Sequence, residues 1–528
     1  MKFLRVLCVL ALALCVTASV YAETQSVKVS GDLTMRTIYR SAYELQSTPS
    51  ETETTVGTRD GFDSNNQSWI MSVAAIQVDA DLTDNVQTVI RVLNQRDWNV
   101  YAKDPQSNSG LTPNGRGHYW ANENEFNVML DLAYVQLKDF IYSPLTLTIG
   151  RQNLWIGKGF IVGANQQNPG LISDQGSATA TTTLAARNNP GLLVPGNLSA
   201  PEYTAINSFD SVKMVLDYDP WTLTGIYSKI YEDAIQARDD VNLWGVNAGY
   251  KFNTYKAEAE AYWFWKQDRS IPVWGASPKA TANDVHTFGL RGSFDPIDII
   301  TIAAEGAYQG GTYIGNQQQQ AVRSRSAFAL DVSGELRYFT DKSAWKPKLG
   351  VEYIYYSGAK PESSTNDVNG YIRDDSTYTG WDMMYRGKFD SAIREYIGRF
   401  YSTQRYAPNT PAGTNTNVGA QCPDASYTNQ SQLIFMGSIQ PVESLTLKAN
   451  YNLFWNLQPY LGDISTNDKN TSQGFVGQEI DLSANWDYTE DVSFGVLAAW
   501  FVPGEVYDYN GNKATTATDL VGTVKVSF

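Results

Sequence analysis

The segment TDLVGTVKVSF, residues 518–528, alternates apolar and polar side chains with a period of two. Its apolar parity includes Leu520, Val524, Val526 and Phe528, and its polar parity includes Thr523 and Lys525. Because successive side chains of a β-strand point to opposite faces, the pattern predicts a strand with one apolar and one hydrated face. An edge strand exposes unpaired backbone groups, so we expect this strand to pair with the similar segment near 27–41.

The same alternation recurs along the whole chain of 528 residues. In QEIDLSANWDY, residues 478–488, apolar Ile480 and Leu482 alternate with acidic Glu479 and Asp481. We count about 18 candidate strands, a number typical of large membrane barrels. They lie near 27–41, 69–82, 85–98, 126–139, 144–153, 208–219, 220–232, 241–253, 254–267, 285–295, 298–309, 325–340, 345–357, 429–440, 443–457, 475–488, 490–502 and 516–528.

The connections between these strands alternate between short and long. Tight turns such as 83–85, 219–220, 253–254 and 441–443 are followed by longer loops, the largest of which are 42–68, 99–125, 154–207 and 358–428. No segment has the roughly 18 consecutive apolar residues of a spanning helix, which leaves a closed barrel as the way to cross a membrane. The pattern predicts an antiparallel outer-membrane β-barrel with short periplasmic turns and long outer loops.

A half-exposed soluble sandwich gives the same period of two, and the aromatic residues argue against it. The chain contains 32 Tyr and 14 Trp, and most tryptophans fall at the ends of candidate strands. Interfacial girdles of a membrane barrel require that placement, whereas a sandwich core places tryptophan in mid-strand. Examples are Trp98, Trp155, Trp221, Trp244, Trp263, Trp265, Trp345, Trp455, Trp486 and Trp500.

The N-terminus has the features of a secretory signal peptide over residues 1–22. Lys2 and Arg5 precede an apolar core, and small residues stand before a cleavage point at Glu23. Cys8 and Cys15 belong to that segment, so residues 23–528 would form the barrel with Cys422 as their one cysteine. We therefore expect an exported chain with no intramolecular disulfide.

Two of the long loops exceed what a simple rim loop needs. Within loop 358–428, apolar residues recur at helical spacing over 389–401, with Asp390 as a candidate N-cap. This short helix either packs on or into the mouth of the barrel, or lies on its outer rim. The sequence leaves both placements open.

Catalytic and metal-binding patterns are weak. The two histidines are His118, in a polar loop, and His286, which shares its parity with apolar neighbours and is expected to face lipid. We predict no enzymatic activity, no cofactor and no metal site, since 59–66 and 508–519 lack the spacing of a calcium loop. The net charge of −15 argues against nucleic acid as a partner.

The polar parity of each strand is expected to face the interior, because charged side chains in the lipid midplane cost about 2–4 kcal/mol. A closed sheet of this size encloses water, so these residues would line a channel of mixed charge. The candidate pore-lining residues are Lys28, Asp32, Arg36, Arg40, Arg91, Arg151, Lys213, Lys256, Glu258, Glu260, Arg291, Glu305, Arg325, Asp331, Glu335, Arg337, Glu352, Lys448, Glu479 and Asp481. Strict parity groups Arg151 with Leu147 and Ile149, so its inclusion requires a bulge at Gly150 or a strand that has reached the rim.

The segments 145–163 and 207–229 resemble the alginate-export family of outer-membrane barrels. The resemblance begins with a strand that ends in Gly-Arg-Gln and continues, after a loop, with a Phe-Asp strand and a Trp-bearing strand. The motifs DVHTFGLRG (284–292), AAEGAYQGG (303–311) and KPKLGVEYIYYSG (346–358) follow in the same order. The resemblance implies 18 strands and passive passage of a polyanionic or carbohydrate solute. The interior of this chain is mixed in charge rather than dominated by arginine.

Together these features predict an outer-membrane porin for diffusion or export of polar solutes, including anionic or carbohydrate solutes. The alternative is a surface binding or adhesion protein that uses its long loops. The expected partners are outer-membrane lipid and lipopolysaccharide, the barrel assembly machinery and the diffusing solute. Phe528 resembles the terminal aromatic signal by which such barrels are recognised for assembly.

Overall fold

The computed structural model describes residues 26–42, 45, 67–98, 128–165, 200–232, 240–269, 283–314, 322–337, 344–358, 377–388, 390–394, 428–458, 474–505 and 513–528. The signal peptide predicted over 1–22, His118, Cys422 and most of the long loops lie outside these residues. Over the same ranges, no helix has both the length and the apolar character needed to cross a membrane.

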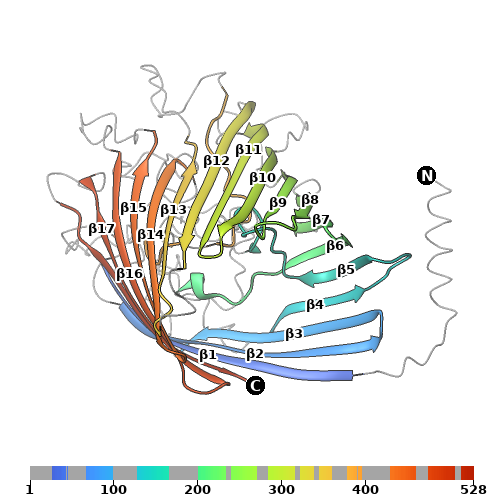
Figure 1. Cartoon of the computed structure of the whole chain (residues 1–528), viewed down its shortest axis with the longest axis horizontal. Helices are drawn as coiled ribbons and strands as arrows, with labels where there is room; N and C mark the ends of the chain where they lie inside the picture. The colour runs from blue at the N-terminus through green and yellow to red at the C-terminus, as the bar shows by residue number, and fades with distance from the viewer. Residues whose placement is uncertain are drawn as a thin grey trace, which may run out of the picture.

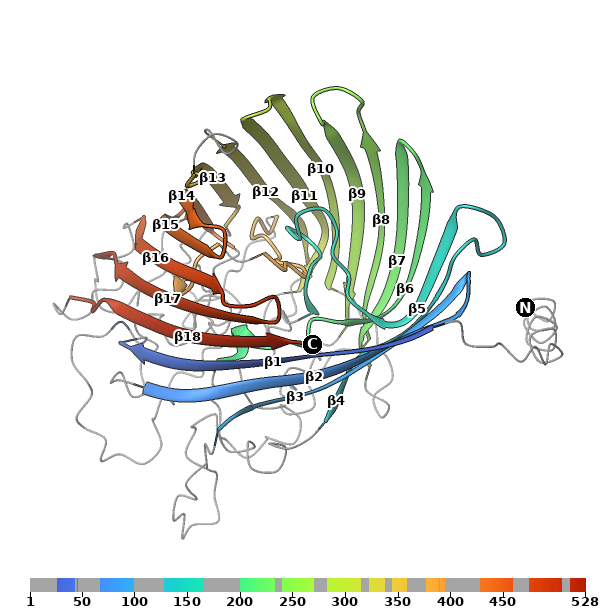
Figure 2. The ribbon, with the colours of Figure 1, turned by 60° about the horizontal axis from the view of Figure 1, so that its bottom comes forward.

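Eighteen antiparallel strands form one sheet in which each strand pairs with its neighbours in sequence, and the sheet curves around a central space (Figures 1 and 2). The strands are β1 (Ser26–Ser41), β2 (Gln67–Thr83), β3 (Val86–Asp97), β4 (Met129–Leu137), β5 (Leu145–Gln152), β6 (Phe209–Tyr218), β7 (Trp221–Tyr231), β8 (Val241–Lys251), β9 (Glu258–Asp268), β10 (Asn283–Ile297), β11 (Ile300–Ile314), β12 (Val322–Leu336), β13 (Lys348–Tyr356), β14 (Gln430–Val442), β15 (Leu445–Asn456), β16 (Phe475–Asp487), β17 (Val492–Pro503) and β18 (Ala517–Ser527).

The first and last strands close the barrel. β1 pairs with both β2 and β18, and its register with β18 runs from Asp32 opposite Ser527 to Ser41 opposite Thr518. Beyond the end of β18, the Gly31 N–H donates to the Phe528 carbonyl at 2.8 Å and the Phe528 N–H donates to the Gly31 carbonyl at 3.0 Å. Every strand therefore has two partners, which confirms the predicted closure.

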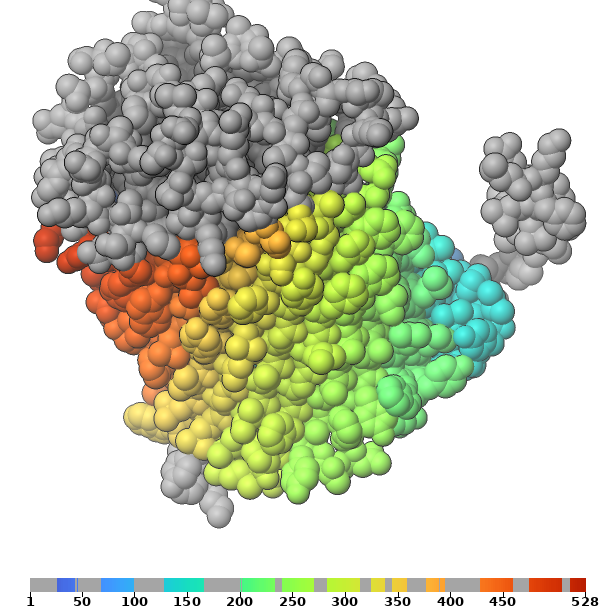
Figure 3. Space-filling view, turned by 90° about the horizontal axis from the view of Figure 1, so that it is seen from above, coloured from blue at the N-terminus to red at the C-terminus, as the bar shows by residue number. Residues whose placement is uncertain are grey.

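The two faces of the sheet differ as the alternation predicts. Outward-facing Leu290, Val496 and Leu349 are 69%, 60% and 60% exposed, although they are strongly apolar. Such a contiguous apolar surface matches the acyl chains of a bilayer and would not suit water. Figure 3 shows this outer surface, on which strands from the middle of the chain lie side by side.

The positions of all eighteen predicted strands are confirmed, with the largest boundary differences at β9, β11 and β12. Strand β11 extends to Ile314 rather than to residue 309, and β12 covers Val322–Leu336 rather than 325–340. The predicted strand 254–267 begins only at Glu258, because the chain turns over residues 252–257. Tyr255 and Lys256 have φ of 57° and 46°, a left-handed conformation that ends strand pairing. The predicted turn at 253–254 is therefore longer than the sequence indicates.

Gly31 accommodates the Phe528 ring at the closing seam. A Cβ atom added to Gly31 would lie 2.6 Å from Cζ of Phe528 and 2.9 Å from the carbonyl oxygen of Ala75. Gly522, on the neighbouring strand, has open space instead, with no atom within 4 Å of its added Cβ. The two glycines form a matched pair for testing the seam.

We expect Gly31→Ala to destabilise the barrel by about 1–2 kcal/mol through overpacking at the seam. Gly522→Ala should be neutral or slightly stabilising, since alanine has the smaller entropy cost in a strand. Thermal unfolding of the purified barrel in detergent measures both. The loss of stability caused by Gly31→Ala should be smaller in a Phe528→Ala background. An equal loss of stability in both backgrounds would contradict this account of the seam.

Candidate functional site: the barrel interior and the segments that fold into it

Charged residues form rows across the inner face of the barrel. Glu260, Arg291, Glu305 and Asp331 occupy directly neighbouring positions on β9, β10, β11 and β12. The Arg291 guanidinium binds the carboxylates of Glu260 and Glu258, the latter at 2.6 Å. Opposite charges on neighbouring strands stabilise the pairing of Arg291 with Glu260 and Glu305, whereas Glu305 and Asp331 are like charges that face each other.

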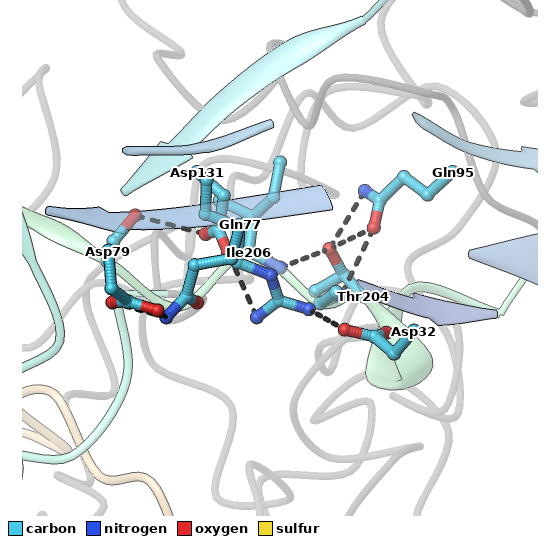
Figure 4. Close-up of polar contacts among 10 residues, drawn as sticks. Asp32, Gln77, Asp79, Gln95, Asp131, Thr204 and Ile206 are labelled. Atoms are coloured by element: carbon cyan, nitrogen blue, oxygen red, sulfur yellow. Dashed lines mark hydrogen bonds and ion pairs between the residues drawn. The ribbon is translucent and has the colours of Figure 1, made fainter. Parts of the chain in front are cut away.

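A second group of polar contacts lies on β1, β3 and β4 (Figure 4). The Arg91 guanidinium donates to Asp32 at 2.7 Å and approaches Asp131 at 3.4 Å. Asp131 is the extra residue of a bulge, because the register of β4 against β3 shifts between Arg91 and Val92. The bulge brings a second carboxylate, from β4, into contact with the arginine.

Two segments fold from the rim into the interior. Residues 153–165 follow β5, and residues 377–394 precede β14, with residue 389 outside the described ranges. Phe160 and Val162 of the first and Trp381 and Met384 of the second are at most 5% exposed. They pack in one apolar cluster with inward-facing residues of β6–β14, including Ile354. Figures 1 and 2 show both segments inside the curve of the sheet.

The two segments are joined to each other. Val162 and Tyr385 form a parallel β-bridge, and the N–H groups of Gly163 and Tyr385 donate to the carbonyls of Tyr385 and Ile161 at 2.7 and 2.9 Å. The Gly387 N–H donates to the Gly159 carbonyl at 2.9 Å. We call residues 153–165 and 377–394 together the inner segments, since their backbones form a single hydrogen-bonded unit.

Ion pairs fix the inner segments to the wall. Lys388 binds Glu352 and lies 3.5 Å from Asp331 and 3.0 Å from Asp390. Burial alone would lower the pKa of Lys388, but these three carboxylates outweigh it and raise the pKa above its ordinary value. The lysine is therefore a charged anchor between the segment and strands β12 and β13.

A second anchor involves Asp382, which accepts from Lys266 of β9 at 3.0 Å. Burial raises the pKa of Asp382, but the charges of Lys266 and Arg325 outweigh that effect and lower it. Arg325 itself donates to the Gly380 carbonyl at 3.0 Å. Both contacts hold the segment with hydrogen bonds to charged groups, which are the stronger kind.

Glu479 of β16 holds the far end of the second inner segment. Its carboxylate accepts the backbone N–H groups of Ala392, Ile393 and Arg394 at 2.7, 2.8 and 2.7 Å. The residues of the predicted 389–401 helix that the structure describes thus start inside the barrel rather than on its outer rim. Asp390, the expected cap, binds Arg386 at 2.5 Å and Lys388 at 3.0 Å.

A short 3₁₀ helix, η4 (Pro201–Tyr203), brings further contacts to β1. Arg40 binds Glu202 and lies over the Trp69 ring, 5.4 Å from its centroid. Arg36 lies over the Tyr203 ring at 4.8 Å. Arg36 and Arg40 lie four residues apart on the inward face of β1, and each guanidinium lies over an aromatic ring.

The structure changes the placement of two predicted pore-lining residues. The pairing of β5 with β4 and β6 continues through Gly150 without a register shift, so the proposed bulge is absent. Arg151 lies on the outward parity at the rim and binds Asp210 at 3.1 Å. Lys256 lies in the turn before β9 and is 70% exposed near Asp295 and Asp298.

The remaining candidates keep the inward parity that the sequence predicts, although solute contact at them stays a prediction. Arg337 follows β12 directly and binds Glu335 at 3.1 Å. His286 is on the outward parity, stacked with Trp265 and Trp263, as expected for a lipid-facing residue. The others on the inward parity, beyond those described above, are Lys28, Lys213, Lys448 and Asp481.

Sequence reasoning assigned Trp155 to the interfacial girdle, whereas the structure places it in the first inner segment. It also missed Lys158, Asp382, Arg386 and Lys388 of the inner segments. A signal was present, since six of the nine residues 154–162 at the start of this loop are apolar. Apolar residues in a long loop indicate a buried contact somewhere. The sequence did not show which strands of the barrel these apolar residues would contact.

The family model for alginate export matches residues 198–519, which is more than half of the chain. The chain belongs to the alginate-export family. Membership confirms the resemblance found in the sequence, places the barrel in the bacterial outer membrane and supports a channel role. The family is one of export channels rather than of enzymes. No group of His, Cys, Asp and Glu in the described ranges could hold a metal ion.

Solved structures of outer-membrane proteins are similar over nearly the whole length. OccK9 (OpdG) of Pseudomonas aeruginosa has 10% identity and a TM-score of 0.48, covering 96% of this chain and 99% of that one. OccAB1 of Acinetobacter baumannii has 10% identity and a TM-score of 0.48, covering 97% and 99%. OccK2 (OpdF) of P. aeruginosa, solved with glucuronate, has 10% identity and a TM-score of 0.45, covering 96% and 99%. No curated protein sequence matches this chain.

We expect Lys388→Met to destabilise the barrel by about 3 kcal/mol, because it leaves Asp331 and Glu352 buried without their cation. Lys448→Met is the matched control. Lys448 is an exposed inward-facing lysine with no ion pair to any described residue, so its loss should cost less than about 0.5 kcal/mol. Thermal unfolding in detergent compares them. Equal stability of the two variants would contradict the anchoring role of Lys388.

Proposed function

We propose that this protein is a passive outer-membrane channel for polar solutes, including anionic or carbohydrate solutes, whose width is set by the inner segments. The observation that carries the proposal is a closed barrel with a charged inner face and two joined segments folded against one side of it. Some ion pairs of the inner face hold the inner segments in place. The inward-facing cations outside such pairs suit a barrel through which polar solutes pass.

The ion pairs described above leave some inward cations available to solutes. Most inward carboxylates bind arginine, lysine, tyrosine or backbone N–H groups; Glu305, for example, accepts from the Tyr262 hydroxyl at 2.7 Å. Arg36, Lys213 and Lys448 face inward with no ion pair to any residue that the structure describes. Free cations among neutralised carboxylates attract anions and raise their local concentration.

The proposal predicts stable open-channel currents from the purified full-length chain in planar lipid bilayers. Folding is checked independently by the shift in gel mobility on heating that stable barrels give. A correctly folded barrel that carries no current would contradict the channel and favour a surface-binding role for the loops.

Arg36→Gln should shift the reversal potential in a salt gradient towards cation preference, because it removes a cation that has no ion pair with a carboxylate in the described part of the chain. Lys256→Gln removes the same charge from a periplasmic turn and should leave the potential nearly unchanged. Both variants are measured in the same bilayers as the wild type. An unchanged potential for Arg36→Gln would show that Arg36 does not face the ion path.

A further inference from the structure

Trp155 is an exposed tryptophan in the interior of the barrel. It is 55% exposed, whereas its neighbours in the same segment, Leu154 and Phe160, are 1% and 2% exposed. The segment lies in the barrel interior and reaches the inner face of the sheet. A Cβ added to Gly157 would be 3.3 Å from Cδ of Arg291 and 3.5 Å from Oε2 of Glu260, which both face inward. A tryptophan serving only the packing of this segment would be buried with the others.

The indole ring of Trp155 lies against three glycines. Cβ atoms added to Gly159, Gly163 and Gly387 would lie 2.6, 3.1 and 2.7 Å from atoms of the ring. Any side chain at these positions would force the ring to move. The glycines come from both inner segments, so the joined unit as a whole supports the ring.

The edge of the ring is fixed as well. The Trp155 Nε1–H donates to the Gly157 carbonyl at 3.1 Å, which satisfies the only polar group of the side chain. The ring is therefore held in one orientation with its hydrogen bond made internally. Trp155 nevertheless stays 55% exposed, so aromatic surface remains available in the interior.

We propose that Trp155 is a stacking platform for the sugar ring of a carbohydrate solute that passes through the barrel. This inference rests on the proposed channel function and specifies its solute class. A pyranose presents an apolar C–H face that packs on an aromatic ring, while its hydroxyl groups require hydrogen-bonding partners.

The surroundings of the platform fit a sugar better than an apolar solute. Asn153, two residues before Trp155, is exposed. Glu258, which binds the Arg291 that lies next to Gly157, is 39% exposed on its side chain. Carboxylate and amide groups can bind hydroxyls at the rim of a stacked ring. An aromatic or alkyl solute would need a second apolar wall, and the described groups near the segment tip are instead the charged side chains of Glu258, Glu260 and Arg291.

The test is titration of the channel current with β-1,4-linked glucose oligomers in planar bilayers. The wild type should show saturable block. Trp155→Ala should weaken the apparent affinity about tenfold, which corresponds to about 1.4 kcal/mol. Trp155→Phe, which keeps a smaller flat ring, should lie in between. Block is expressed relative to the conductance of each protein in salt alone, and polyethylene glycol of matched size should act equally on all three proteins.

Trp345→Ala is the matched control, since Trp345 is 56% exposed but lies in the connection before β13. It should leave sugar block unchanged. Where Trp155→Ala does not give a heat-modifiable barrel, Trp155→Phe decides the question. An open wild-type channel that sugars do not block, or equal block in wild type and Trp155 variants, would overturn this inference and leave the channel intact. Absence of current in the wild type would overturn the channel function itself.

Discussion

The structure depends on one constraint, which is that no backbone N–H or carbonyl group can stay unpaired in lipid. Eighteen antiparallel strands satisfy it only because β1 pairs with β18 as well as with β2. At the seam, reciprocal hydrogen bonds between Gly31 and Phe528 extend the pairing beyond the last strand. Once the sheet is closed, the period of two assigns each side chain to lipid or to the interior.

The charged interior serves the architecture before it serves any solute. Charges that are buried without partners cost several kcal/mol, so the inner segments can fold against the wall only where cations meet carboxylates. Two sets of ion pairs do this. Lys388 pairs with Asp331 and Glu352, and Asp382 pairs with Lys266. Glu479 binds three backbone N–H groups instead of a cation. The net charge of the lumen is thus a poor guide to selectivity, because many of its charges neutralise each other.

The sequence was sufficient for the barrel because strand alternation and strand ends are local features. It predicted all eighteen strands and the outward position of His286. It failed where the conformation of one or two residues determines where a strand begins. Tyr255 and Lys256 have positive φ, so the chain turns where a strand start was predicted. It also failed for Arg151, because a continuous register through Gly150 leaves no bulge to turn the side chain inward. The inner segments could not be predicted, since contacts such as Val162 with Tyr385 join loops more than two hundred residues apart.

The central claim is that the inner segments narrow a conducting barrel, and single-channel conductance tests it most directly. The full-length chain is compared with a variant in which residues 378–393 are replaced by a flexible glycine–serine linker. Both proteins must first show the heat-dependent gel shift of a folded barrel. The account predicts a larger single-channel conductance for the variant, because the wall that the segment covers becomes open to water. Equal conductance in the two proteins would contradict it.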